Sequence, residues 1–370
     1  MQRVSFATGN DIIEITKKAI DLEGNFESTF LDKKRILVLI NVLDSQNFES
    51  GTTTAPDVVR GVCEKLHELD KDVTVCGCSW YGGNTEEAFR ILKFHELADE
   101  VGFKLLDVKK NPFSVKKIEN NLQFSEMKIS SLAYQYDGVI TIPTLKTHSA
   151  ATISLGMKSL MGFLHDSYKR RFHSYDLSKA IVDLSSAVNI DYVVLDAIYG
   201  KIGDETYGGS FKFNSVFCAK NIYALDIVGA NLLGYELKEV PHLLIAKEKG
   251  LFSFDKDDID VIGEVKKYYE KVLVPKETKK KFRSLNVVDK DACCPCFSSL
   301  VYAIDRLSDK EIQKLKDDPI YIGQHVEEAD RGIFVGHCNR KFKDKGLFIS
   351  GCPAKASDIY KMIKEYLNSK

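Results

Sequence analysis

The 370-residue sequence has no surplus of charge of either sign, and this absence narrows the classes of partner. It holds 52 Lys and Arg residues against 53 Asp and Glu residues, for a formal net charge of −1. Binding to nucleic acid or to an anionic membrane normally requires a basic surplus. We therefore expect neither partner for the chain as a whole, while local basic patches are compatible with this balance.

Long apolar runs are also missing. No run approaches the length of a membrane-spanning helix, and the residues from Met1 to Phe6 lack the apolar core of a signal peptide. These two absences predict a cytosolic protein. In that compartment the nine cysteines are expected to be thiols or metal ligands and not a disulfide framework.

Short apolar runs alternate with amphipathic segments through most of the chain. After an amphipathic helix predicted over 11–22, the runs 35–43, 73–78 and 104–108 are typical of strands that a parallel sheet buries on both faces. Helices are predicted between these strands. This alternation predicts an α/β fold with mostly parallel sheets.

The pattern is interrupted near residue 175 and again near residue 285. We expect two α/β lobes, residues 1–175 and 176–285, with a cleft between them. A small cysteine-rich domain is predicted to follow over residues 286–370. An ordinary chain of this length is long enough for more than one core.

Three loops follow predicted strands, over residues 41–56, 79–84 and 144–148. Ligands of parallel sheets bind beyond the carboxyl ends of the strands, so these loops are expected to converge on one site. Gly82 and Gly83 would let the backbone approach a phosphate, a carboxylate or a cofactor, although a plain tight turn explains them equally well. Asn84 is expected to cap the following helix, with Glu87 as its capping partner.

The third loop belongs to the most informative stretch of the chain. Residues 138–142 are a predicted buried strand and residues 150–161 a predicted helix, which leaves Lys146 and His148 in the loop between them. A helix N-terminus offers unpaired N–H groups and the positive end of a dipole, so a small anionic ligand is expected there. The competing interpretation is that both side chains are solvated surface groups.

Lys158 follows His148 by ten residues. In an unbroken helix this separation is roughly 15 Å, so both serve one site only if the helix breaks near Gly156 or the ligand is long. The later basic segment 165–173, which ends in His173, is either an exposed helix surface or an anion clamp over the same loop.

The strongest chemical signal lies in the C-terminal part. Four thiolates, from Cys293, Cys296, Cys338 and Cys352, would suit an iron–sulfur cluster or a structural zinc ion. A 4Fe-4S cluster is favoured because the last two cysteines are far apart in sequence and have glycine close before them. Zinc, or thiols without metal, are the alternatives. A cluster requires the four sulfur atoms to converge.

Two sequence motifs resemble a known family. The segment Pro143-Thr-Leu-Lys-Thr-His148, together with Gly156-Met-Lys-Ser-Leu-Met-Gly162, is similar to the signature of the family called domain of unknown function 362. The resemblance extends from about Lys34 to about Leu251. Members commonly carry a lysine just before the Asn that ends the first strand, whereas Leu39 and Ile40 precede Asn41 here. Any role of that lysine does not carry over.

Further resemblances concern the tail and the spacing of the motifs. The segments around Cys338 and Cys352 resemble ligand segments of the small cluster-bearing subunit of respiratory complex I. The order of His148, Lys158 and His173 resembles that of nickel-pincer lactate racemases. That likeness implies that the lysine anchors the cofactor and that the histidines bind metal and move the proton.

Three functions follow as hypotheses. The first is an iron–sulfur protein with an anion-binding α/β cleft, acting in electron transfer with a redox partner or in substrate activation. The second is an isomerase-type metalloenzyme, and the third is a zinc-stapled binding protein without chemistry. The sequence does not determine the substrate, the redox partner or the oligomeric state.

Overall fold

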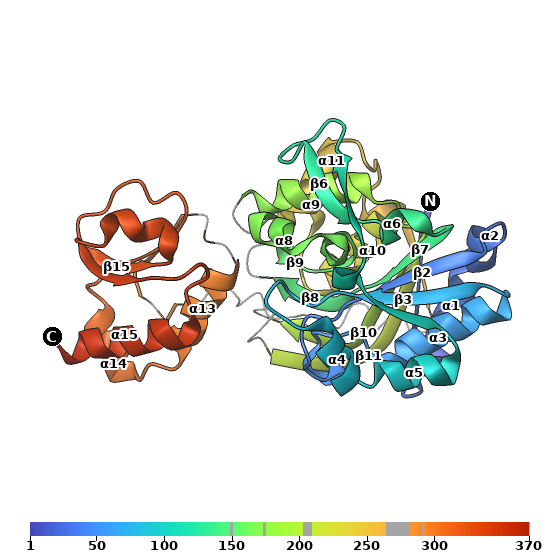
Figure 1. The fold of residues 1–370 in the computed structure, drawn as a ribbon, viewed down its shortest axis with the longest axis horizontal. Coiled ribbons are helices and arrows are strands. Elements are labelled where there is room, and N and C mark those ends of the chain that lie inside the picture. Colours follow the sequence, from blue (N-terminus) through green and yellow to red (C-terminus); the bar gives the residue numbers. More distant parts are fainter. Residues whose placement is uncertain are drawn as a thin grey trace. The chain divides into compact units, whose positions relative to one another are not determined.

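A computed structural model describes residues 1–148, 151–172, 175–202, 209–263, 282–283, 285–290, 292 and 294–369 (Figure 1). His173, Cys293 and residues 203–208 lie outside this description. The chain divides into two compact units, Met1–Val274 and Pro275–Lys370, called here the first unit and the second unit.

A ten-stranded sheet forms the centre of the first unit. Its main path has the order β12-β1-β11-β10-β7-β2-β3-β4, and β8 joins through β10 and pairs with β9. Strands β4, β3, β2, β7 and β10 run parallel, whereas β11 is antiparallel to both its neighbours. The strands are β1 (Gln2–Thr8), β2 (Arg35–Ile40), β3 (Asp72–Gly77), β4 (Lys104–Asp107), β7 (Gly138–Ile142), β8 (Thr144–His148), β9 (Thr152–Ile153), β10 (Tyr192–Ile202), β11 (Gly209–Ala219) and β12 (Ile259–Ile262); β5 (Phe113–Lys117) and β6 (Glu126–Ser130) form a separate hairpin.

Helices cover both faces of this sheet. Figure 1 shows α1, α3 and α5 on one side of it and α9, α10 and α11 on the other. Alternate residues of β2, such as Ile36 and Val38, pack with Ile20 of α1 and Val62 of α3 in one buried cluster. The helices are α1 (Ile12–Glu23), α2 (Phe26–Phe30), α3 (Pro56–Glu68), α4 (Thr85–Ile91), α5 (Phe94–Val101), α6 (Leu132–Gln135), α7 (Gly156–Ser159), α8 (Asp166–Phe172), α9 (Leu177–Ala187), α10 (Ile222–Leu232) and α11 (Pro241–Glu248).

The second unit has a smaller sheet and its own core. Four parallel strands follow the order β13-β14-β15-β16. Apolar residues of α13 and α15, among them Leu300 and Ile363, pack with strand residues such as Ile333 in one buried cluster. The elements are β13 (Val287–Lys290), α13 (Cys294–Asp305), α14 (Asp309–Leu315), β14 (Ile320–Gly323), β15 (Gly332–Val335), β16 (Gly346–Ile349) and α15 (Ala356–Asn368).

The predicted α/β class with mostly parallel sheets is confirmed. The arrangement differs from two lobes at one point, because strands on either side of residue 175 belong to one sheet. β10 hydrogen-bonds to both β7 and β8, so residues 192–202 continue the sheet that residues 138–148 begin. Among the described helices, none is long and apolar enough to cross a membrane.

The predicted loop and helix after β7 are wrong in detail. Residues 144–148 form strand β8, because they pair in parallel with β10 and in antiparallel with β9. In the predicted helix 150–161, residues 152–153 are strand β9 and the helix α7 begins only at Gly156. Lys146 and His148 are therefore strand residues.

Candidate functional site

Two lysines and a histidine lie side by side on β8 and β10. Lys146 and His148 are two positions apart on β8, so their side chains leave the same face of the strand. Lys201 on β10 is the register partner of Lys146. The three residues are only 3–4% exposed. Their burial contradicts the alternative that Lys146 and His148 are solvated surface groups.

The start of α7 brings Lys158 towards this group. Asp226 of α10 accepts hydrogen bonds from the backbone N–H groups of Gly156 and Met157, at 2.7 and 2.8 Å. A Cβ atom on Gly156 would lie 2.7 Å from Asp226 Oδ1, so only glycine allows this close approach. Helix α7 thus begins at Gly156 and does not run through it, which meets one of the two conditions under which His148 and Lys158 could serve one site. Lys158 is 9% exposed.

His242 of α11 completes the cluster. It is fully buried, and neither of its ring nitrogens has a hydrogen-bond partner among the described residues. Burial, followed by the nearby His148 and Lys158, lowers the pKa of His242 to about 3. The Thr152 hydroxyl donates to the Glu239 carbonyl at 3.3 Å, which ties the partner strand of β8 to the segment before α11.

The hydrogen bonding of His148 fixes its neutral tautomer. Its Nδ1 atom accepts a hydrogen bond from the Ala151 N–H at 3.1 Å. The ring proton of the neutral form must then be on Nε2. With the proton there, Nε2 is a donor and has no lone pair for a metal, so this arrangement suits an anion better than a metal ion.

The loop after β2 lies against the same strands. Asn41 Nδ2 donates to Thr144 Oγ1 at 3.3 Å, and a Cβ atom on Gly51 would meet Lys201 Cβ at 3.1 Å. Asp196 of β10 accepts the Ala55 N–H at 2.6 Å, and burial raises its pKa to about 6. The expected convergence of the loops 41–56 and 144–148 is confirmed by these contacts.

Gly82, Gly83 and Asn84 form a tight turn and a helix cap. The Gly83 N–H donates to the Trp80 carbonyl at 2.9 Å, and the Trp80 ring occupies the space that a Cβ atom on either glycine would need. The Asn84 side chain accepts the Glu87 N–H at 3.1 Å, which confirms the predicted N-cap of α4. A cofactor contact at these residues stays a prediction.

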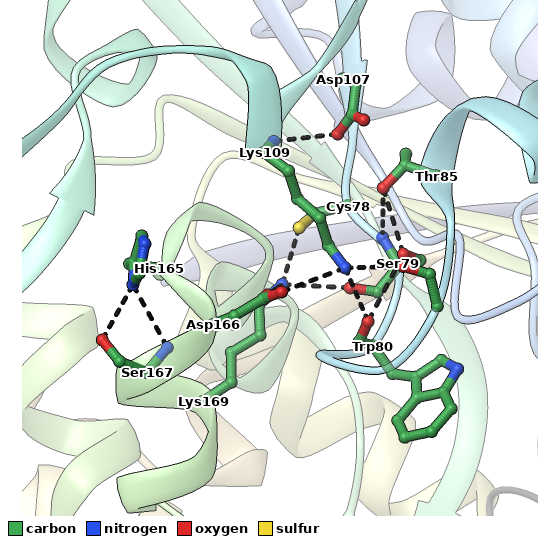
Figure 2. A network of polar contacts seen from close by, with 11 residues as sticks. Cys78, Ser79, Trp80, Thr85, Asp107, Lys109, His165, Asp166, Ser167 and Lys169 are labelled. Atoms are coloured by element: carbon green, nitrogen blue, oxygen red, sulfur yellow. Dashed lines mark hydrogen bonds and ion pairs between the residues drawn. The ribbon is translucent and has the colours of Figure 1, made fainter.

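Two lysines, Lys109 and Lys169, bind carbonyl groups of the loop that contains this turn, as Figure 2 shows. Lys109 Nζ donates to the carbonyls of Trp80 and Gly83 at 2.8 and 2.9 Å. Lys169 Nζ contacts the Ser79 carbonyl at 3.1 Å, and Asp166 lies 3.3 and 3.4 Å from the two ammonium groups. The described part of the basic segment 165–173 therefore holds the loop after β3. The predicted role of His173 lies outside the described residues.

Comparison with known proteins agrees with the motifs around Lys146 and Lys158. A family model described as domain of unknown function (DUF362) matches residues 36–231, more than half of the chain. The protein belongs to the DUF362 family. The matched region holds Lys146, His148, Lys158 and Lys201, but not His242.

Comparisons with individual proteins found further similarities. A thylakoid-associated protein of Synechocystis sp. is 24% identical over 135 residues, which are 35% of this chain and 42% of that protein. The chain thus matches less than half of that relative's length. The lactate racemase apoprotein of Thermoanaerobacterium thermosaccharolyticum shares 16% identity at a TM-score of 0.42, covering 62% of this chain and 56% of that one.

The cysteine-bearing segments lie beyond the DUF362 region, in the second unit. The Sγ atoms of Cys296 and Cys338 both lie 3.4 Å from the position a Cβ atom would take on Gly336, so they are at most twice that distance apart. Gly336 has φ +90°, which a side chain would strain. The His337 N–H donates to the Gly351 carbonyl at 2.8 Å, so the segment of Cys352 adjoins that of Cys338.

The donor set fits a thiolate-bound metal group only in part. Within the described ranges, no three side chains of metal-binding type lie close enough to hold one ion. Cys293 lies outside those ranges, and the convergence of all four sulfurs stays a prediction. The Ala354 N–H donates to Cys296 Sγ at 3.4 Å, as amides do around cluster ligands.

Proposed function

We propose that the first unit binds a small anionic ligand at the cluster formed by Lys146, His148, Lys158, Lys201 and His242. One observation carries the proposal: these buried basic side chains from β8, β10, α7 and α11 form a continuous chain of neighbours. Lys146 and Lys201 stand opposite each other on adjacent strands, where like charges repel. An anion bound beside them would reduce this repulsion, in addition to the contacts that both lysines already make.

The position in the fold also supports an anion site. The cluster lies where β8 and β10 reach their carboxyl ends, at the edge where α/β sheets bind ligands. The buried carboxylates of Asp196 and Asp226 accept backbone N–H groups. The two acidic side chains are thus hydrogen-bonded to the backbone of the loop 41–56 and of α7.

The same groups suit substrate activation. Lysine ammonium groups would hold the anionic end of a substrate, and the Nε2–H of His148 would donate to an oxygen on which charge develops. A neutral imidazole such as His242 would exchange a proton with the bound molecule. The isomerase-like alternative is favoured by the start of α7 at Gly156, which brings Lys158 into the neighbourhood of His242.

Ligand binding tests the proposal directly. We would measure binding of phosphate and of acetate to the full chain by calorimetry, with the variants Lys146→Met and Lys158→Met. Each variant is expected to weaken binding at least tenfold, because a charged contact is lost. Lys104→Met, at an exposed position on β4, should bind like the parent protein. Unchanged affinity in both cluster variants would contradict the proposal.

We further propose that the second unit carries a 4Fe-4S cluster on Cys293, Cys296, Cys338 and Cys352. The approach of Cys296 and Cys338 at Gly336 supports it. Such a cluster would supply one-electron chemistry. Because Cys338 and Cys352 are exposed, a redox partner could approach it closely. We include a cytoplasmic location in this proposal, because the reducing conditions there keep the cysteines from forming disulfides.

Anaerobic purification followed by metal and sulfide analysis and a visible spectrum distinguishes the alternatives. Iron with sulfide and a brown colour would support the cluster. Zinc without colour would support the zinc-stapled binding protein, and neither metal would leave the cysteines as thiols.

A further inference from the structure

His242 is the most unusual member of the cluster. Its imidazole is fully buried, and both ring nitrogens are without a hydrogen-bond partner in the described part of the chain. A buried polar atom left unsatisfied costs about 1–3 kcal/mol. Nothing on α11 itself explains a histidine there, because an apolar residue would fill the space without this cost. A hydrogen-bond partner supplied by a bound ligand would explain the histidine at this position.

The donors of the cluster outnumber the oxygens of a single carboxylate. The ammonium groups of Lys146, Lys158 and Lys201 have three N–H donors each, so a contact within the chain leaves further donors for a ligand. The imidazoles of His148 and His242 carry one N–H each in their neutral forms. A carboxylate has two oxygens. A phosphate group has three strong acceptor oxygens and a charge of about −1.5 to −2 at neutral pH. Several ammonium groups and two neutral imidazoles therefore match a phosphate group better than a carboxylate.

We propose that the ligand carries a phosphate group and that His242 donates a hydrogen bond to one of its oxygens. This inference rests on the proposed anion site of the first unit. Free phosphate and a phosphate ester share the chemistry that the cluster would recognise. The low pKa of His242 supports a neutral donor, because the imidazole then adds a directed hydrogen bond without adding a positive charge beside Lys158.

Calorimetric titration of the full chain tests the inference with three probes: inorganic phosphate, glycerol 3-phosphate and acetate. The parent protein should bind a phosphate probe at least tenfold more tightly than acetate. His242→Phe should weaken phosphate binding about ten- to a hundredfold, the loss expected for a hydrogen bond to a charged acceptor. His242→Gln keeps an N–H donor and should recover part of the loss. His165→Phe, at a partly exposed histidine that bonds to Ser167, is the matched control.

The outcomes separate the two levels of proposal. If neither phosphate probe nor acetate binds the parent protein, the anion site itself is overturned. If acetate binds as tightly as phosphate, the anion site stands and the phosphate assignment is overturned. If folded His242→Phe and His242→Gln both bind phosphate like the parent, the role of His242 is overturned. Tighter binding of glycerol 3-phosphate supports an ester as ligand, and tighter binding of inorganic phosphate supports the free ion.

A measurement on the unaltered protein covers the case in which His242→Phe does not fold. In protein with ¹⁵N-labelled histidine, the ring nitrogens of His242 should shift on addition of inorganic phosphate, and acetate should shift them less. Ring signals that stay unchanged at saturating phosphate would overturn the inference.

Discussion

The two units place their reactive groups in opposite surroundings. In the first unit, Lys146, His148 and His242 are buried, and burial lowers the pKa of His242 to about 3. In the second unit, Cys338 and Cys352 are exposed, and Gly336 sets the backbone path beside them. This difference indicates that burial would control the chemistry of the proposed anion site, whereas backbone geometry would control the proposed cluster site. Substitutions should therefore change stability and ionisation in the first unit, and cofactor retention in the second.

The largest effect is expected in the second unit. Cys296→Ser and Cys338→Ser should each abolish a bound cluster, seen as loss of iron, sulfide and visible absorption. Anion binding by the first unit should stay unchanged, because its site residues lie in another core. Cys63→Ala, in the buried face of α3, should keep the colour. A protein that retains its full iron content in either serine variant would contradict the assignment.

Asp226→Ala should give the next largest effect. It leaves the N–H groups of Gly156 and Met157 without their acceptor, and the free energy of unfolding should fall by about 2–5 kcal/mol. Chemical denaturation measures this. Anion binding should weaken as well, since the start of α7 positions Lys158. The exposed acid Asp72 offers the control Asp72→Ala, with an expected change of at most about 0.5 kcal/mol. Equal losses in the two variants would contradict a special role of Asp226.

His242 should make the first unit sensitive to acid. Its pKa is about 3 in the folded protein and about 6.5 when unfolded. Between these values the unfolded chain binds the extra proton, so the free energy of unfolding falls as pH decreases. The slope contributed is at most about 1.4 kcal/mol per pH unit.

Denaturation between pH 6.5 and pH 4 checks this dependence. His242→Phe should flatten the acid limb, whereas His165→Phe should leave it as in the parent protein. Parallel curves for the parent and His242→Phe would show that His242 is not buried in its neutral form.

The smallest effect concerns the clamp after β3. Lys109→Ala removes two hydrogen bonds to the turn of Trp80 and should cost about 1 kcal/mol. Trp80 is the single tryptophan of the chain, so its fluorescence reports directly on this turn and should change. Lys110→Ala, at an exposed neighbour that pairs with Glu86, should alter neither quantity. An unchanged spectrum in Lys109→Ala would show that the turn does not depend on the clamp.

The parts of the fold that the sequence predicted are those with local signals. The apolar runs of β2, β3 and β7 and the cap at Asn84 were predicted, because burial on both faces and capping leave a pattern within a few residues. β1 and β8 were missed. β8 is polar at alternate positions, and it becomes a strand by pairing with β10, some fifty residues later.

The sequence by itself determined the α/β class, the apolar strands β2, β3 and β7, the family motifs around Lys146 and Lys158, and the spacing of the cysteines. Only the tertiary structure decided that Lys201 stands beside Lys146 and that His242 adjoins His148 and Lys158. The physical reason is that a periodic pattern reports which face of a segment is buried. Which charged groups meet in that interior, and what burial does to their pKa values, depends on strands and helices that pair across more than fifty residues.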